Sequence, residues 1–219
     1  MTQTSFPPSD LWCSPGFHLV RVEADIVILD VCGDAYHCLP GAAATLEVGA
    51  DGRITGPDPA ILSGLVEAGV ATAQAPACPR RPIPRAAREL VSHPSSRPSE
   101  VVRAGWALAL STVAFRGRSL ASLAADDSAC PDQDPVDEVR LARLVGAARA
   151  ARPWVPFEGE CLQRAFQLRR FLAGRGLAVD WIFGVRTWPF GAHCWLQAGD
   201  LVVGDRLDRV GRYTPIMRT

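Results

Sequence analysis

Three residues in the last third of the chain, Cys161, His193 and Asp205, could form a nucleophilic triad. A cysteine thiol attacks acyl carbons once a neighbouring base has taken its proton, and histidine is the usual base. A carboxylate that accepts a hydrogen bond from the imidazole holds the ring in the working tautomer and orientation. The types and order of these residues therefore predict covalent catalysis, with Cys161 as nucleophile, His193 as base and Asp205 as orienting group.

Cys161 is expected on the first turn of a helix. Residues 156–160 contain a proline and a glycine, and apolar residues then recur at helical spacing until Gly174 and Gly176 end the pattern. The free backbone N–H groups and the positive end of the helix dipole favour the thiolate at such a position. Considered alone, a cysteine beside Leu162 could equally be a small buried hydrophobic residue.

His193 and Asp205 are expected on a β-hairpin made of two β-favouring runs, 192–197 and 201–205. The register of this hairpin decides whether the triad can form. A two-residue loop would place Asp205 opposite Cys194 and turn it away from the histidine. A three-residue loop would place Asp205 directly across from His193, where their side chains can meet. We predict the three-residue loop.

The amino-acid composition excludes several other kinds of catalytic site. The chain of 219 residues contains neither asparagine nor lysine, which excludes an asparagine orienting group, a Ser-Lys dyad, a lysine Schiff base and a Walker-type lysine. Its 23 basic and 23 acidic residues give a formal net charge of zero, so no overall field favours nucleic acid or a membrane surface as a partner. The apolar run 104–115 is shorter than the roughly 20 residues of a membrane span.

Four segments around the triad carry a family resemblance: Cys161-Leu162-Gln163-Arg164-Ala165, Phe183-Gly184-Val185-Arg186, Pro189-Phe190-Gly191-Ala192-His193-Cys194-Trp195 and Val203-Gly204-Asp205. They resemble the transglutaminase-like leader peptidases of lasso-peptide biosynthesis, called B proteins, over about residues 100 to 219. The resemblance implies a papain-like or transglutaminase-like cysteine protease domain with an antiparallel sheet, and assigns the family's Cys, His and Asp to the three residues above. Cys194 departs from the family, which is expected to have a small apolar residue there.

The resemblance also implies a substrate and partners. Such an enzyme cuts the leader from a ribosomally made precursor peptide, and a separate ATP-using macrolactam synthetase then closes the ring. We expect no bound cofactor, because the chain has no phosphate-binding GxxxxGK[ST] motif. Any ATP dependence would then come through the synthetase partner.

The first part of the chain favours three short strands followed by helices. The expected strands are 17–22, 25–31 and 35–38, and the expected helices are 41–48 and 59–68. Asp58 is an expected N-cap, with Pro59 at the first helical position. This order resembles the RiPP recognition element, a winged-helix-like module that is a separate protein in many lasso clusters and would here be fused.

That resemblance implies how the leader binds. The leader would add as a strand to the edge formed by residues 34–38 and pack its apolar side chains beside the 59–68 helix. The candidate contacts are Tyr36, Leu62, Leu65 and Val66. For Leu62 and Leu65, a place in the core of a small domain is an equally good interpretation.

We therefore expect an α+β protein with a recognition element at 1–78, a proline-rich linker at 79–98 and a peptidase domain at 99–219. Helices are expected over 99–125 and 136–151. The acidic residues at 126, 127, 132 and 134 could suggest a metal site, but Asp134 before a proline is better explained as a helix N-cap.

Seven cysteines remain to be explained. The first residues show no secretory signal, so a reducing cytoplasm without disulfides is expected. A zinc site from Cys13, Cys32, His37 and Cys38 is disfavoured because their spacing is not that of a structural zinc knuckle.

Two further functions stay open from the sequence. The same thiol site could transfer an acyl group to an amine, since hydrolysis and transfer share one thioester. The chain could also be a non-catalytic, leader-binding chaperone. For the oxyanion hole, the Cys161 N–H is a natural donor, and Gln163 and Trp154 are candidate side-chain donors.

Overall fold

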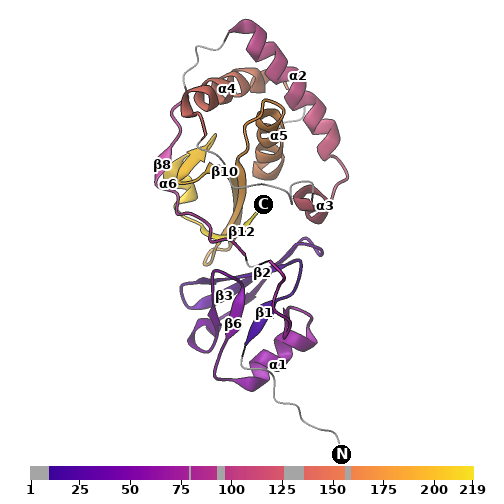
Figure 1. Cartoon of the computed structure of the whole chain (residues 1–219), viewed down its shortest axis with the longest axis vertical. Helices are drawn as coiled ribbons and strands as arrows, with labels where there is room; N and C mark the ends of the chain where they lie inside the picture. The colour runs from indigo at the N-terminus through magenta and orange to yellow at the C-terminus, as the bar shows by residue number, and fades with distance from the viewer. Residues whose placement is uncertain (1–9, 79, 93–96, 126–135, 156–158) are drawn as a thin grey trace, which may run out of the picture. The chain divides into compact units, whose positions relative to one another are not determined.

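The computed structural model describes residues 10–78, 80–92, 97–125, 136–155 and 159–219. It divides into two compact units, shown in Figure 1. The N-terminal unit is Met1–Ile83 with Val185–Phe190, and the C-terminal unit is Pro84–Gly184 with Gly191–Thr219. The predicted linker 79–98 is therefore too long at its C-terminal end, because residues from Pro84 onward belong to the C-terminal unit.

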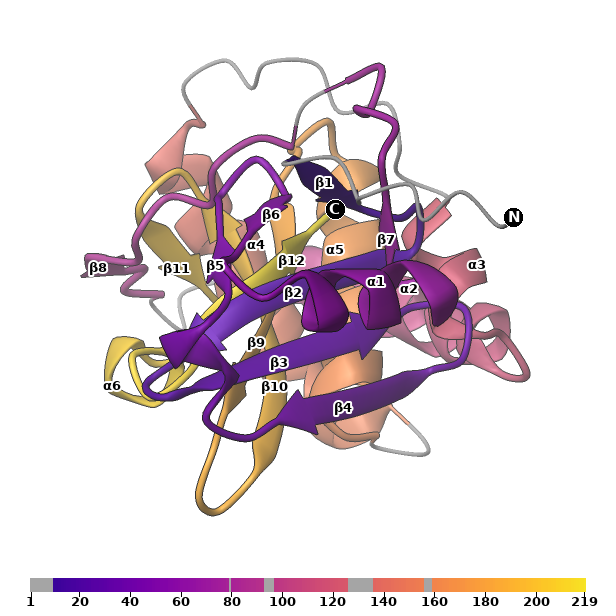
Figure 2. The same ribbon diagram turned by 90° about the horizontal axis from the view of Figure 1, so that it is seen from below.

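The N-terminal unit contains the three predicted strands. They are β2 (Phe17–Val22), β3 (Asp25–Asp30) and β4 (Ala35–Leu39), which pair antiparallel in the order β2-β3-β4. Figure 2 shows them side by side. The two connecting turns contain Glu23 and Asp34 with positive φ angles of 54° and 50°, a conformation that suits tight turns. β4 is an edge strand of this sheet.

A second sheet in the same unit is not foreseen by the sequence pattern. Its strands, in sheet order, are β5 (Glu47–Val48), β6 (Arg53–Thr55), β1 (Leu11–Cys13) and β7 (Ala71–Thr72). The predicted helix over 41–48 is wrong: only a 3-10 helix, η1 (Ala42–Ala44), forms there. Alanine favours helix, but pairing of Val48 with Ile54 draws the end of the segment into the sheet.

Helix α1 (Pro59–Glu67) begins as predicted, with the Asp58 carboxylate accepting a hydrogen bond from the Ala60 N–H at 2.9 Å. Leu62 and Leu65 are only 5% and 7% exposed and pack in the core with residues such as Leu11 and Ile54. Of the two interpretations that the sequence left open for these leucines, the structure supports a position in the core. Val66, which is 41% exposed, lies on the outer face.

The C-terminal unit contains five α-helices and one 3-10 helix among the described residues. They are α2 (Pro98–Phe115), α3 (Leu120–Ala125), α4 (Glu138–Ala151), the 3-10 helix η2 (Arg152–Trp154), α5 (Cys161–Ala173) and α6 (Leu207–Val210). The single helix predicted over 99–125 is broken near Gly117, whose φ is 70°. α4 is capped by Asp137, which accepts from the Arg140 N–H; the predicted cap Asp134 and the rest of the acidic cluster lie outside the described residues.

The sheet of this unit has the order β12-β9-β10-β11-β8. Its strands are β8 (Arg88–Glu89), β9 (Asp180–Arg186), β10 (Gly191–Ala198), β11 (Leu201–Val203) and β12 (Thr214–Arg218). β10 and β11 pair antiparallel, as expected, whereas β8, which comes from the predicted linker, pairs with β11 in parallel. This pairing is why the linker ends early.

Helix α5 packs on β10 and is covered by α2 and α4 (Figure 1). Gln167 of α5 is 3% exposed and donates a 2.8 Å hydrogen bond to Thr112 of α2. Because a buried amide without a partner costs free energy, this contact fixes how α5 sits against α2. Among the described residues, no helix is both long and apolar enough to cross a membrane.

The burial pattern of α1 gives a stability prediction. We expect Leu62→Ala to lower the free energy of unfolding of the N-terminal unit by about 2–5 kcal/mol, because it leaves a cavity in the core. The matched control is Val66→Ala on the exposed face of the same helix, with an expected change below about 0.5 kcal/mol. Amide hydrogen exchange of β1 and β6 in the full chain measures both. Equal losses in the two variants would contradict the assigned core.

Candidate active site

Cys161 is the first residue of α5, as predicted. Glu160 precedes it in an extended conformation, with φ −71° and ψ −173°, and its side chain makes no capping hydrogen bond. Cys161 therefore stands at the positive end of the helix, a position that favours the negative form of a thiol.

The structure brings the three predicted triad residues together. The His193 Nε2 atom lies 2.6 Å from the Asp205 Oδ2 atom, and the His193 side chain also hydrogen-bonds to Cys161. Since Nε2 faces the carboxylate, Nδ1 is the ring nitrogen left for the thiol. The imidazole thus connects the nucleophile to the acid, which is the arrangement that a thiol triad requires.

The predicted hairpin loop is wrong, although the triad forms. Leu196 pairs with Val203 and Ala198 with Leu201, so the loop has two residues, Gly199 and Asp200. In that register, a continued strand would have placed Asp205 opposite Cys194. Asp205 is not held in this register, because β11 ends at Val203, two residues before it.

Gly204 redirects the chain between β11 and Asp205. Its φ of +74° lies in the left-handed region, which glycine adopts without the strain that a Cβ atom introduces. A Cβ atom built on Gly204 would also lie 2.6 Å from the Leu168 Cδ2 atom of α5. The sequence contained this glycine, but its role becomes visible only with the observed register.

Two contacts then hold the Asp205 loop in place. The Arg206 N–H donates to Asp205 Oδ1 at 2.8 Å, and the Leu207 N–H donates to Glu89 Oε2 at 2.8 Å. Glu89 belongs to β8, in the segment predicted to be a linker. Its role was missed because nothing in the local sequence shows that β8 joins this sheet.

The charges of the triad support a thiolate–imidazolium pair. The hydrogen bond from Cys194 and that from His193 are the main causes that lower the pKa of Cys161 to about 4. Burial by itself lowers the pKa of His193, but hydrogen bonds to Asp205 and Cys161 outweigh it and raise that pKa to about 9. Between about pH 4 and pH 9 the site therefore holds a thiolate next to a protonated imidazole.

Asp205 stays ionised beside this pair. Burial raises its pKa, but the hydrogen bonds from His193 and the Arg206 N–H, together with the charges of His193 and Arg209, lower it overall. The Arg209 Nη1 atom lies 3.9 Å from Asp205 Oδ1. The carboxylate can thus stabilise the imidazolium throughout the pH range in which the thiolate exists.

Aromatic rings restrict the imidazole. The Trp195 ring stacks near His193 with centroids 6.1 Å apart, and the Tyr213 ring lies at 5.2 Å. His193 is only 7% exposed. The ring is therefore oriented by packing as well as by Asp205.

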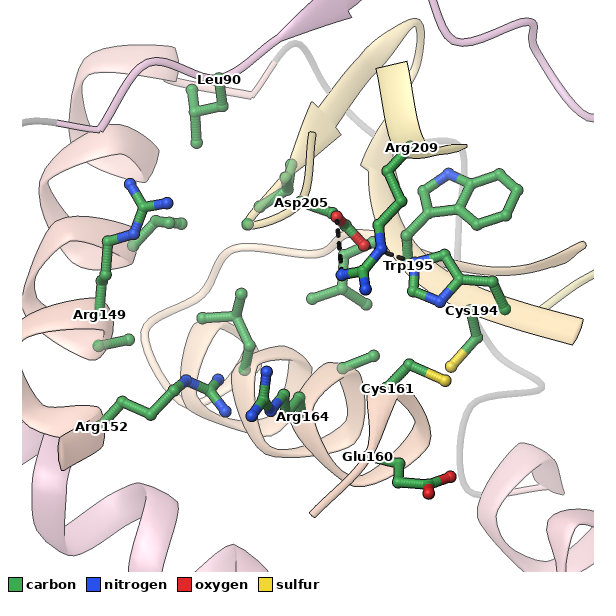
Figure 3. A pocket seen from close by; sticks show the side chains of 18 of the residues that line it. Leu90, Arg149, Arg152, Glu160, Cys161, Arg164, Cys194, Trp195, Asp205 and Arg209 are labelled. Carbon is green, nitrogen blue, oxygen red and sulfur yellow. Dashed lines mark hydrogen bonds and ion pairs between the residues drawn. The ribbon is translucent and has the colours of Figure 1, made fainter. Parts of the chain in front are cut away.

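The cavity at the triad is shown in Figure 3 and has a volume of about 730 Å³. That volume lies within the range of small-ligand pockets and can take a short peptide segment. Seven charged residues are part of its wall: the basic ones are Arg149, Arg152, Arg164 and Arg209, and the acidic ones are Glu89, Glu160 and Asp205.

The remaining candidates are placed as follows. Gln163 and Trp154 are not among the residues that line the cavity, and Trp154 is 84% exposed. Tyr36 is half-buried on the edge strand β4. Within the described ranges, no group of three or more His, Cys, Asp or Glu side chains is placed to hold a metal ion.

Two known groups of proteins resemble parts of this chain. The model of a family described as "Transglutaminase-like superfamily" matches residues 104–218. A segment of 49 residues is 37% identical to the microcin J25-processing protein McjB of Escherichia coli, and covers 22% of this chain and 24% of that protein. The chain thus aligns with about a quarter of McjB. No solved structure matches the chain.

The positive φ angle of Gly204 and its close approach to Leu168 give a prediction for the triad. In Gly204→Ala, the new Cβ atom displaces the loop, so His193 loses the carboxylate and its pKa falls from about 9. Gly199→Ala is the matched control, because its φ of +60° imposes similar backbone strain while nothing lies within 4 Å of the added Cβ atom. NMR titration of the His193 ring measures the effect. An equal fall in both variants would show that the contact with Leu168 is not the cause.

Proposed function

Because the chain belongs to the transglutaminase-like superfamily, we propose that it is a cysteine peptidase that removes the leader from a ribosomally made lasso-peptide precursor. The observation that carries this proposal is the Cys161–His193–Asp205 triad, with its thiolate–imidazolium pair, on the wall of a peptide-sized cavity. The similarity of one segment to a protein named for processing microcin J25 supports the choice of substrate.

The first half of the reaction makes a thioester. The Cys161 thiolate attacks the carbonyl carbon of the scissile peptide bond, and the new oxyanion takes a hydrogen bond from the Cys161 N–H at the start of α5. His193 then gives its proton to the leaving amine as the C–N bond breaks. The products of this half are a thioester between Cys161 and the leader, and the free amine of the core peptide.

The second half releases the leader. Neutral His193, held by Asp205 at 2.6 Å, takes a proton from water, and the hydroxide attacks the thioester carbon. The C–S bond breaks, Cys161 returns to the thiolate, and the leader leaves as a free acid. If an amine attacked instead of water, the same site would perform acyl transfer.

The N-terminal unit is proposed to bind the leader. Its β4 is an edge strand of the three-stranded sheet, and an extended peptide can add to an edge of this kind. Tyr36 on this strand and Val66 on the exposed face of α1 are the candidate contacts, while buried Leu62 and Leu65 would act only by supporting α1. The precursor peptide and a lasso macrolactam synthetase are the proposed partners, and any need for ATP would belong to that synthetase.

Cleavage of the precursor tests the enzyme. The precursor peptide encoded beside this gene is incubated with the wild-type protein and with Cys161→Ala, with and without the synthetase and ATP, and analysed by mass spectrometry. We expect cleavage by the wild type and a loss of at least the order of 10³-fold in Cys161→Ala, because alanine cannot form the thioester. Cys13→Ala, which removes a buried thiol of the N-terminal unit, should cleave normally.

Other results of the same experiment would contradict the proposal. An amine adduct in place of the free leader acid would indicate acyl transfer. Binding of the precursor without cleavage by either protein, even with the synthetase present, would indicate a leader-binding chaperone.

Leader binding tests the N-terminal unit separately. A fluorescent peptide of the leader alone should bind Tyr36→Ala about tenfold more weakly than wild type, since a ring at an edge strand contributes of the order of 1.4 kcal/mol. Glu47→Ala, an exposed position on β5 of the other sheet, is the control and should bind normally. Unchanged affinity in a folded Tyr36→Ala protein would remove this residue from the leader site.

A further inference from the structure

A second thiol lies next to the nucleophile. Figure 3 shows the sulfur atoms of Cys161 and Cys194 facing each other. The two side chains share a hydrogen bond, and the Cys194 backbone N–H also reaches the Cys161 sulfur. Both residues line the same cavity, one from the start of α5 and the other from β10. The two sulfur atoms thus lie side by side in one cavity, on elements that are separate in the sequence.

The two sulfurs differ in access and in charge. Cys161 is half-buried, whereas Cys194 is only 4% exposed. The hydrogen bond to Cys161 and then burial raise the pKa of Cys194 well above its ordinary value. Cys161 is therefore the sulfur that meets a solute first, and Cys194 is a protonated thiol held directly behind it.

The geometry points to Cys194 as a resolving thiol: when a hydroperoxide oxidises Cys161, the two sulfurs join in a disulfide that blocks the nucleophile reversibly. The peptidase mechanism gives Cys194 no step. This inference concerns regulation of the site and depends on a reactive Cys161, but it does not depend on which peptide is cleaved.

The chemistry balances in two steps. The Cys161 thiolate attacks one oxygen of the hydroperoxide; the O–O bond breaks, sulfur is oxidised to sulfenic acid, and His193 supplies the proton that the leaving oxygen needs. The Cys194 sulfur then attacks the sulfenic sulfur and its proton leaves with the hydroxyl group as water, which forms the S–S bond. Two equivalents of an external thiol reverse the reaction and become a disulfide themselves.

The position of Cys194 would also prevent irreversible oxidation of Cys161. A sulfenic acid that meets no thiol is oxidised further to sulfinic and sulfonic acids, which external thiols do not reduce. Since Cys194 is already in hydrogen-bond contact with Cys161, capture within the protein precedes a second encounter with peroxide. The pair would protect the catalytic sulfur while the enzyme is switched off.

The test is mass spectrometry of the full chain treated with hydrogen peroxide, with free thiols then blocked by an alkylating agent. Before alkylation we expect the intact protein to have lost two hydrogen atoms, and after alkylation to carry two alkyl groups fewer than untreated protein. After trypsin, the segments 150–164 and 187–206, which contain Cys161 and Cys194, should be joined. Dithiothreitol should separate them and restore alkylation of Cys161. This readout needs no peptide substrate, so it stays valid even if the proposed cleavage fails.

Variants separate this role from simple oxidation. Cys194→Ala should show Cys161 with two or three added oxygen atoms, not recovered by dithiothreitol, at the dose that gives the disulfide in wild type. Cys13→Ala is the matched control, because Cys13 is also buried, at 7% exposed, and should behave as wild type. If Cys194→Ala does not fold, Cys194→Ser gives the same comparison.

Wild-type protein whose Cys161 passes directly to the sulfinic acid, with no join between the two segments, would overturn the proposal. A join of Cys161 to any other cysteine would do the same.

Discussion

The short contact between His193 and Asp205 is the interaction on which the site depends. At 2.6 Å, it keeps a buried imidazole protonated against the desolvation that would otherwise discharge it. The imidazolium in turn stabilises the Cys161 thiolate. Without the carboxylate, the two reacting groups would revert to a thiol beside a neutral ring, which is a far weaker nucleophilic system.

Much of the C-terminal unit can be understood as support for that contact. The hairpin register alone would direct Asp205 away from the histidine, so the chain must leave the strand before it reaches the carboxylate. Gly204 makes this change of direction against Leu168, and Glu89 then holds the following residue through the Leu207 N–H. The strand that carries Glu89 joins the sheet from 118 positions earlier in the sequence. The contact between His193 and Asp205 thus depends on residues of β8, β10 and α5.

The second thiol, Cys194, bears on both the reactivity of Cys161 and its sensitivity to oxidation. The same hydrogen bonds that lower the pKa of Cys161 bring Cys194 against it. A thiolate is the form that attacks an acyl carbon, and it is also the form that a peroxide oxidises. A protonated thiol beside it therefore acts on both reactions: it stabilises the anion, and it is placed to capture the oxidised product.

Local patterns determined the parts of this protein that depend on nearby residues. The start of α5 at Cys161, the strands β2 to β4 and the cap of α1 by Asp58 follow from breakers, alternation and capping, because each involves groups only a few positions apart. Residue types and order also predicted that Cys161, His193 and Asp205 come together, as they do in the structure. The second sheet of the N-terminal unit, the early end of the linker and the two-residue hairpin loop were decided by tertiary structure. The second sheet and the end of the linker depend on pairing between distant segments. The hairpin loop depends on register, where a shift of one residue reverses every side chain.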